Sequence, residues 1–216
     1  MRNLTQINFR IAALLFAATT IVASCDKNDN GIDNDIDNGA SVSGVVINGI
    51  TWATCNVDAP GTFAASPESA GKFYRWNNSI AWPASGNVAN WPNSATNAAW
   101  YWYISNDPCP SGWRVPTLSE LNSLVKSGSK WTSINGVTGR IFGSDSNTIF
   151  LPACGYRDGD QGTLKNAGIR GNYWSSTEQN SSGAHELEFA SGYAYAGFNE
   201  YYIFRRCGRS VRCVAE

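Results

Sequence analysis

One amphipathic helix is the feature that most limits how this chain can fold. Thr117 is a good helix N-cap, and Glu120, three positions later, completes a capping box. Apolar residues then recur at helical spacing, at Leu118, Leu121, Leu124 and Val125. Gly128 follows them and supplies a C-terminal stop. We therefore expect one main helix, over about residues 117–127, with the other elements packed against it.

The rest of the folded region, from about residue 41, is predicted to form short antiparallel strands. Residues 42–47 and 50–53 are β-rich and are joined by Asn48-Gly49, the strongest short signal for a hairpin. Further strands are expected at 100–104, 148–153, 173–176, 185–189, 193–198 and 210–214, with a long ordered loop at 77–99. Aromatic residues make up 12% of the chain and charged residues only 15%, so a large core is possible without many helices.

The charge balance argues against a nucleic-acid partner. Lysine and arginine number 16 against 17 aspartates and glutamates, which leaves no strong positive field. A nucleic-acid-binding domain normally shows a basic patch or stripe. We expect no such partner.

The N-terminus has the pattern of an exported lipoprotein. Residues 1–24 combine two arginines with an apolar run that is too short for a comfortable membrane span and typical of a secretory signal. Val22-Ala23-Ser24-Cys25 is similar to the bacterial lipobox, in which the cysteine becomes lipidated. We expect a lipid anchor on Cys25 that holds the chain at the cell outer membrane. The alternative is ordinary signal cleavage with Cys25 left unmodified.

Residues 25–40 are predicted to be a disordered tether. The tract is rich in Asp, Asn and Gly and has only two large apolar residues, so it cannot bury enough surface to fold. Lys27 followed by acidic residues is similar to the surface-export signal of Bacteroidetes lipoproteins, although a plain acidic linker is the alternative. The Asp-rich stretch lacks the spacing of a calcium loop.

Five motifs resemble one protein family. In order, they are NGITWATCNV, CPSGWRVPTLSEL, FLPACGYRDG, GNYWSST and GRSVRCV. This order is similar to that of the Fibrobacter succinogenes major paralogous domain family, whose members are abundant as surface lipoproteins. The resemblance covers nearly all of residues 41–216. It implies an α+β, C-type-lectin-like fold, loop-rich and antiparallel, with one main helix.

Besides Cys25, five cysteines remain, an odd number that allows at most two bridges among them. The family pattern links its CPxGWR motif with the terminal SVRC, which implies a disulfide between Cys109 and Cys213. Cys154 and Cys207 are additions to that pattern, and two additions suggest a second bridge. Cys55 is then expected to be an unpaired, buried cysteine.

No motif predicts catalysis, a metal or a cofactor. There is no CxxC and only one histidine, His185, which alternates with Leu187 and Phe189 as a strand residue at the edge of the core does. Asp158 or Asp160 with Glu178 could in principle form the carboxylate pair of a glycosidase. A simple turn at 158–160 is the favoured alternative. We expect a protein that is not an enzyme.

Exposed aromatic rings beside polar groups could bind carbohydrate. The candidates are Trp82, Trp91, Trp100, Trp102, Tyr195, Tyr201 and Tyr202. Small polar surroundings make Trp82 and Trp91 the expected exposed pair, whereas Trp52, Trp113 and Trp174 are expected in the core. Calcium-dependent lectin tripeptides are absent from the sequence.

The resemblance also suggests where a ligand would bind. In C-type-lectin-like folds the long loops on one edge contact the ligand, and here that edge would include Asp158, Asp160, Glu178, Tyr195, Asn199, Tyr201 and Tyr202. A solvated hairpin tip beside core tyrosines is the alternative. The leading function is a surface-anchored, non-enzymatic binding or adhesion module for a glycan or a protein. The alternatives are a structural subunit of a surface appendage or outer-membrane complex, and an enzyme acting on extracellular glycans.

Overall fold

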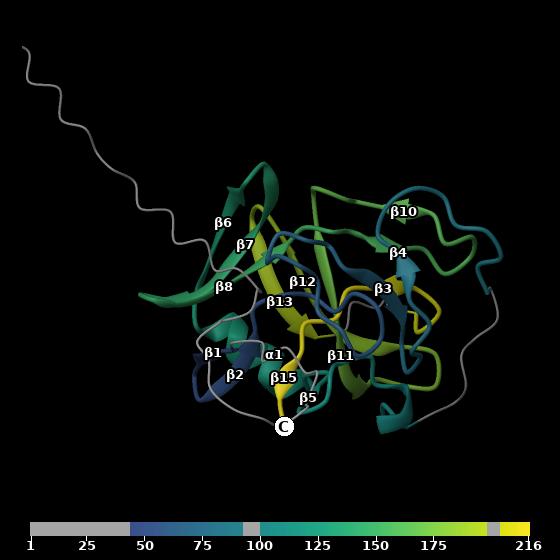
Figure 1. Cartoon of the computed structure of the whole chain (residues 1–216), viewed down its shortest axis with the longest axis horizontal. Coiled ribbons are helices and arrows are strands. Elements are labelled where there is room, and N and C mark those ends of the chain that lie inside the picture. The colour runs from purple at the N-terminus through teal and green to yellow at the C-terminus, as the bar shows by residue number, and fades with distance from the viewer. Residues whose placement is uncertain (1–43, 93–99, 198–203) are drawn as a thin grey trace, which may run out of the picture.

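The computed structural model describes residues 44–92, 100–197 and 204–216. Within these ranges the chain forms fifteen strands, one 3-10 helix (η1, Ile104–Asn106) and one α-helix (α1, Leu118–Lys126). The strands form four small sheets, of order β1-β2-β15-β5, β10-β9-β14-β3-β4, β11-β12-β13 and β6-β7-β8 (Figure 1). Every pairing between these strands is antiparallel.

The first sheet joins early and late parts of the sequence. The hairpin of β1 (Gly44–Ile47) and β2 (Ile50–Ala53) turns at Asn48-Gly49, whose positive φ angles of 51° and 78° suit a two-residue hairpin turn. On the other side of β2 lies β15 (Val214–Ala215), which also pairs with β5 (Trp113–Arg114). The predicted hairpin is confirmed.

A second hairpin was absent from the sequence-based prediction. Strands β6 (Ser129–Ile134) and β7 (Val137–Ser144) turn at Asn135-Gly136, with φ angles of 50° and 81°, and β7 then pairs with β8 (Asn147–Pro152). The turn has the same Asn-Gly signal as the first hairpin. The predicted strand at 148–153 corresponds to β8.

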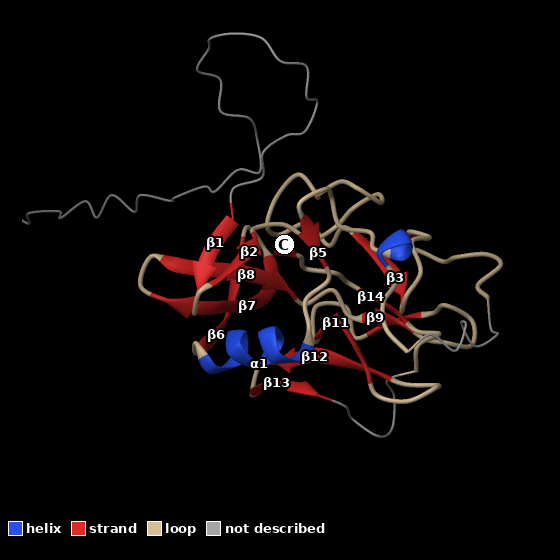
Figure 2. Ribbon diagram, turned by 90° about the horizontal axis from the view of Figure 1, so that it is seen from below, coloured by secondary structure: helices blue, strands red, loops and turns tan. Residues whose placement is uncertain are grey.

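The helix α1 lies between sheets. It packs against β11 (Gly171–Glu178), β12 (Ala184–Ala190) and β13 (Tyr193–Gly197), and it also contacts β7 (Figure 2). Leu121 and Leu124 enter a core with Trp52, Phe142 and Phe189. Thr117 accepts from the Glu120 N–H and completes the expected capping box, so the predicted helix is confirmed to within a residue.

The five-stranded sheet lies at the other end of the molecule, on the right of Figure 1. Its members are β3 (Lys72–Arg75), β4 (Trp82–Pro83), β9 (Tyr156–Arg157), β10 (Leu164–Lys165) and β14 (Gly208–Arg209). A second core cluster, with Tyr74, Trp76, Trp102 and Trp174, lies on this side. Residues 208–215 run from β14 to β15 and so link two sheets, instead of forming the one strand expected at 210–214.

The assignment to an α+β, C-type-lectin-like class is wrong. In the described ranges, strands in four antiparallel sheets provide nearly all the regular structure, and the one α-helix has nine residues. A helix this short fills a space between sheets and forms no layer of its own, so the fold is β-rich. The strand expected at 100–104 is also wrong, since these residues form irregular backbone leading into η1.

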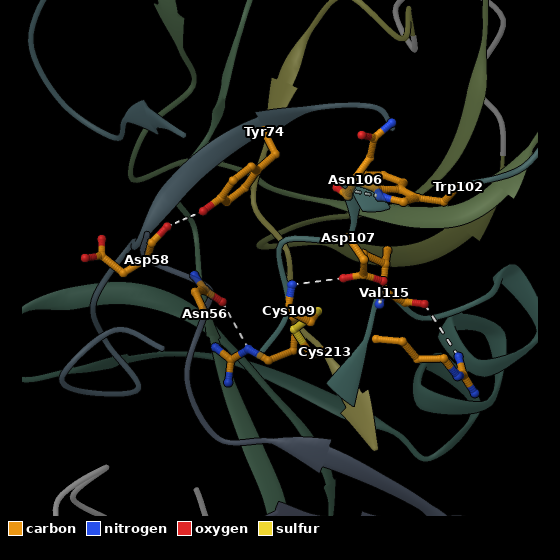
Figure 3. The surroundings of a disulfide bond; sticks show 11 residues. Asn56, Asp58, Tyr74, Trp102, Asn106, Asp107, Cys109, Val115 and Cys213 are labelled. Carbon is orange, nitrogen blue, oxygen red and sulfur yellow. Dashed lines mark hydrogen bonds between the residues drawn. A yellow bond between two sulfur atoms is a disulfide. The ribbon is translucent and has the colours of Figure 1, made fainter. Parts of the chain in front are cut away.

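A disulfide joins Cys109 to Cys213, as the family pattern implied, with their Cα atoms 6.1 Å apart (Figure 3). Asp107 fixes the backbone next to Cys109. Its carboxylate accepts the backbone N–H groups of Cys109 at 2.9 Å and Val115 at 3.0 Å. The bridge therefore ties the segment before α1 to the residue before β15.

The second expected bridge is wrong. Cys154 and Cys207 are both buried, and no disulfide joins them. The Cys154 sulfur lies 3.4 Å from the Pro152 carbonyl oxygen and 3.9 Å from the Tyr173 hydroxyl, and burial raises the pKa of this thiol. Cys55 is fully buried, as expected.

Candidate functional site

The acidic residues predicted from sequence are held by cations and backbone groups. One Asp158 oxygen accepts N–H groups of Asp160, Gln161 and Thr163; burial alone would raise the pKa of Asp158, but these bonds lower it. Asp158 therefore caps a turn, as the simpler interpretation proposed. Asp160 forms an ion pair with Arg206, with a carboxylate oxygen 2.9 Å from a guanidinium nitrogen. Glu178 forms one with Arg205, at 2.8 Å between the corresponding atoms.

Tyr195 lies apart from Glu178. It pairs with Glu188 across β12 and β13, whereas Glu178 pairs with Ala184 at the opposite end of β12. Tyr195 is half-buried, with its ring 6.1 Å from that of Tyr193. The other predicted members of this edge, Asn199, Tyr201 and Tyr202, lie outside the described residues.

Trp82 and Trp91 are not an exposed pair. Their rings contact each other at 4.7 Å, and Trp91 is buried against Gly162 and Gly208. Trp102 is also buried, with its ring 5.6 Å from Trp76. The prediction that Trp82 and Trp91 form the exposed surface is therefore wrong, because each ring covers the other.

Exposed apolar side chains gather instead in one region, which we call the aromatic patch. It consists of Trp100, Tyr101, Tyr103 and Ile104, and the ring centroids of Tyr101 and Tyr103 are 4.9 Å apart. Trp100 is 73% exposed, Tyr101 62% and Ile104 94%. Four of the ten large exposed apolar side chains in the described ranges belong to this patch, and the other six are scattered over the chain. Such a concentration marks a surface for interaction.

The aromatic patch stands on a fixed base. Between its exposed members, Trp102 points inward and donates from its indole nitrogen to the Asn106 carbonyl at 3.1 Å (Figure 3). The Asn77 side-chain oxygen accepts the Tyr103 N–H at 2.8 Å, and the Asn106 amide donates back to the Asn77 carbonyl at 3.1 Å. These bonds join the segment that follows β3 to η1.

The patch also lies in a stretch of chain without charge. Residues 76–106 contain no Asp, Glu, Lys, Arg or His. Of the two charged residues that flank this stretch, Arg75 is buried and Asp107 is engaged with backbone N–H groups. The sequence analysis noted the low overall charge but did not locate this uncharged stretch.

Buried arginines are the main feature that the sequence analysis did not predict. Four of them are almost fully enclosed: Arg157, Arg205, Arg209 and Arg212. Arg157 donates to the carbonyls of Pro83, Ser85, Gly86 and Gly162, and so fixes a loop to a turn. Arg205 lies over the Trp76 ring at 4.2 Å. The only sign of them in the sequence was the occurrence of two arginines, Arg209 and Arg212, within the otherwise largely apolar closing motif GRSVRCV.

Arg212 is surrounded by neutral oxygen atoms. Its guanidinium donates to the carbonyls of Ala53, Thr54 and Phe150 and to the side-chain oxygen of Asn56. Burial lowers the pKa of Arg212 to about 10. The residue therefore joins β2 and its following loop to β8, which is a structural task.

Arg209 forms a buried ion pair with Glu186, and both side chains are 1% exposed. Its guanidinium also lies over the rings of Trp174 at 4.6 Å and Tyr156 at 5.3 Å. Burial raises the pKa of Glu186, while Arg209 and the Asn172 amide oppose that rise. Glu186 and Glu188 lie on the opposite face of β12 from Leu187 and Phe189, and both faces are buried.

His185 is half-buried on β12, and burial lowers its pKa, although a hydrogen bond with the Gly197 backbone opposes this. Among the described residues no group of three or more His, Cys, Asp or Glu side chains could hold a metal. A depression of about 910 Å³ runs beside α1, lined by polar residues that include Thr117, Asn122, Lys126 and Thr177. It contains no aromatic side chain.

Comparisons with known proteins give one partial match. A family model described as a domain of unknown function (DUF8237) matches residues 140–214. This segment runs from β7 to β15 and includes Arg157, Arg205, Arg209 and Arg212, but it excludes the aromatic patch. No curated protein and no solved structure matches the chain. No helix in the described ranges has the length and apolar character needed to cross a membrane.

Proposed function

We propose that this protein is a lipoprotein of the cell outer membrane that acts as a non-enzymatic binding or adhesion module. The observation that carries the proposal is the aromatic patch, because exposed Trp and Tyr side chains on a fixed base are typical of binding hot spots. The predicted carboxylate pair supports catalysis less well, since Asp160 and Glu178 each engage an arginine.

The lipobox and the tether support the anchoring part of the proposal. A lipid on Cys25 followed by a solvated segment to about residue 40 would hold the folded domain away from the membrane. The five motifs that resemble the Fibrobacter succinogenes major paralogous domain family support a surface location in the same way.

Removing the rings should abolish binding without unfolding the protein. We expect cells that display the full-length chain with Trp100→Ala, Tyr101→Ala and Ile104→Ala to lose attachment to printed extracellular glycans and proteins. These side chains are exposed, so the melting temperature should change by no more than about 2–4 °C. Val46→Ala with Ile169→Ala, two exposed apolar sites elsewhere, is the matched control. Attachment that persists in the triple variant would contradict the proposal.

Cys25→Ala should abolish lipid attachment. The sulfur of this cysteine would carry the lipid, and alanine offers no acceptor. Metabolic labelling with palmitate measures the effect, and Cys154→Ala serves as a control because Cys154 lies buried in the folded domain. Label that remains on the Cys25→Ala protein would show that another site is acylated.

A further inference from the structure

We infer that the ligand of the aromatic patch is an uncharged glycan, with sugar faces stacked on Trp100 and Tyr101. This inference rests on the proposed function and narrows it to one class of ligand. The C–H face of a pyranose ring is apolar and flat, and it therefore fits an exposed aromatic face. Trp100 and Tyr101 are the two most exposed rings in the patch.

The stretch of sequence that carries the patch has no charged residue, which disfavours acidic and basic ligands. No charged side chain occurs between Arg75 and Asp107, and neither of these two presents its charge to the patch: Arg75 is buried and Asp107 binds backbone N–H groups. A uronic acid, a sulfate or a sialic acid would lose hydration on binding here and gain no ion pair in return. A neutral sugar has no such cost.

Neutral polar residues also adjoin the patch in the sequence. The exposed Ser105 and the half-buried Asn106 directly follow Ile104. Hydroxyl and amide groups both donate and accept hydrogen bonds, as sugar hydroxyls do. This combination of rings, hydroxyls and amides suits a glycan better than a protein partner, because protein interfaces usually surround their aromatic centre with a charged or polar rim and are enriched in arginine.

The backbone of the patch is held in place by hydrogen bonds within the protein. The buried Trp102 donates to the Asn106 carbonyl, Tyr103 donates its N–H to Asn77, and Asn106 donates to the Asn77 carbonyl. Ordering a loop on binding costs free energy, so a loop that is already held loses less. The exposed, open position of the rings fits an extended chain of sugars, and an enclosed monosaccharide would need a pocket here.

The test uses the full-length protein, purified in detergent, on a printed array of neutral polysaccharides, uronic-acid polymers and sulfated glycans. We expect binding to at least one neutral polysaccharide, at equal strength in low and high salt. Trp100→Ala should weaken it about tenfold or more, because aromatic residues dominate such surfaces. Trp100→Phe keeps a ring and should restore part of the affinity, and Ile169→Ala should bind as the unaltered protein does.

The outcomes separate this inference from the proposed function. Binding only to acidic glycans, binding that falls with salt, or binding that Trp100→Ala leaves unchanged would overturn the inference. Binding to no glycan would also overturn it. If the triple variant still loses attachment to printed proteins in that case, the adhesion proposal stands with a protein as the partner.

Discussion

Glu186→Ala should lower the free energy of unfolding by about 3–5 kcal/mol, the usual cost of leaving one member of a buried ion pair alone. The substitution would remove the carboxylate that balances the charge of Arg209. The Arg209 side chain is only 1% exposed, and its guanidinium lies over the rings of Trp174 and Tyr156. Urea denaturation followed by tryptophan fluorescence measures the change.

Two further variants test the cause. Glu186→Gln keeps the shape and the hydrogen bonding to Arg209 and should cost less than Glu186→Ala. Replacing both members, as Glu186→Leu with Arg209→Met, removes the unpaired charge and should recover much of the loss. A loss below about 1 kcal/mol for Glu186→Ala would show that the pair contributes no more than an exposed one does.

Cys109→Ser should lower the free energy of unfolding by about 2–5 kcal/mol, as expected for a bridge across a long loop. The two cysteines are 104 residues apart, so the unfolded chain gains much freedom when the bridge is absent. Cys213→Ser should have a similar effect, and the double variant should cost no more than either single one. Equilibrium unfolding with and without reductant provides the measurement.

Peptide mapping under non-reducing conditions is the direct control. Cys109 and Cys213 should appear in one linked peptide pair, while Cys154 and Cys207 should react with an alkylating reagent only after unfolding, because both are buried. A peptide that joins Cys109 to any other cysteine would contradict the pairing.

Local signals predicted local structure well. The capping box at Thr117 and Glu120 and the turn at Asn48-Gly49 depend on backbone conformations that a few neighbouring residues decide, and both occur as expected. The Asn135-Gly136 hairpin carries the same signal and could have been predicted. The fold class could not, because it depends on how four small sheets meet, and a resemblance in short motifs says little about that.

Side-chain exposure was the hardest property to predict. Trp82 and Trp91 lie in small polar surroundings, yet their rings cover each other, whereas the aromatic run at 100–104 looks like a strand and is largely exposed. The local pattern of β12 does not identify Glu186 as buried, because the arginine that pairs with it lies 23 residues later in the sequence. Burial is a long-range property, and a local pattern does not contain it.

The position of β15 has a consequence for export. This strand pairs with β2, Cys213 bonds back to Cys109, and Arg212 binds the carbonyl of Ala53 from 159 residues away in the sequence. In the exported protein that we propose, a chain threaded from its N-terminus would have to emerge almost entirely before these contacts could form. Such a domain would complete its fold only after translocation, in a compartment where thiols can oxidise.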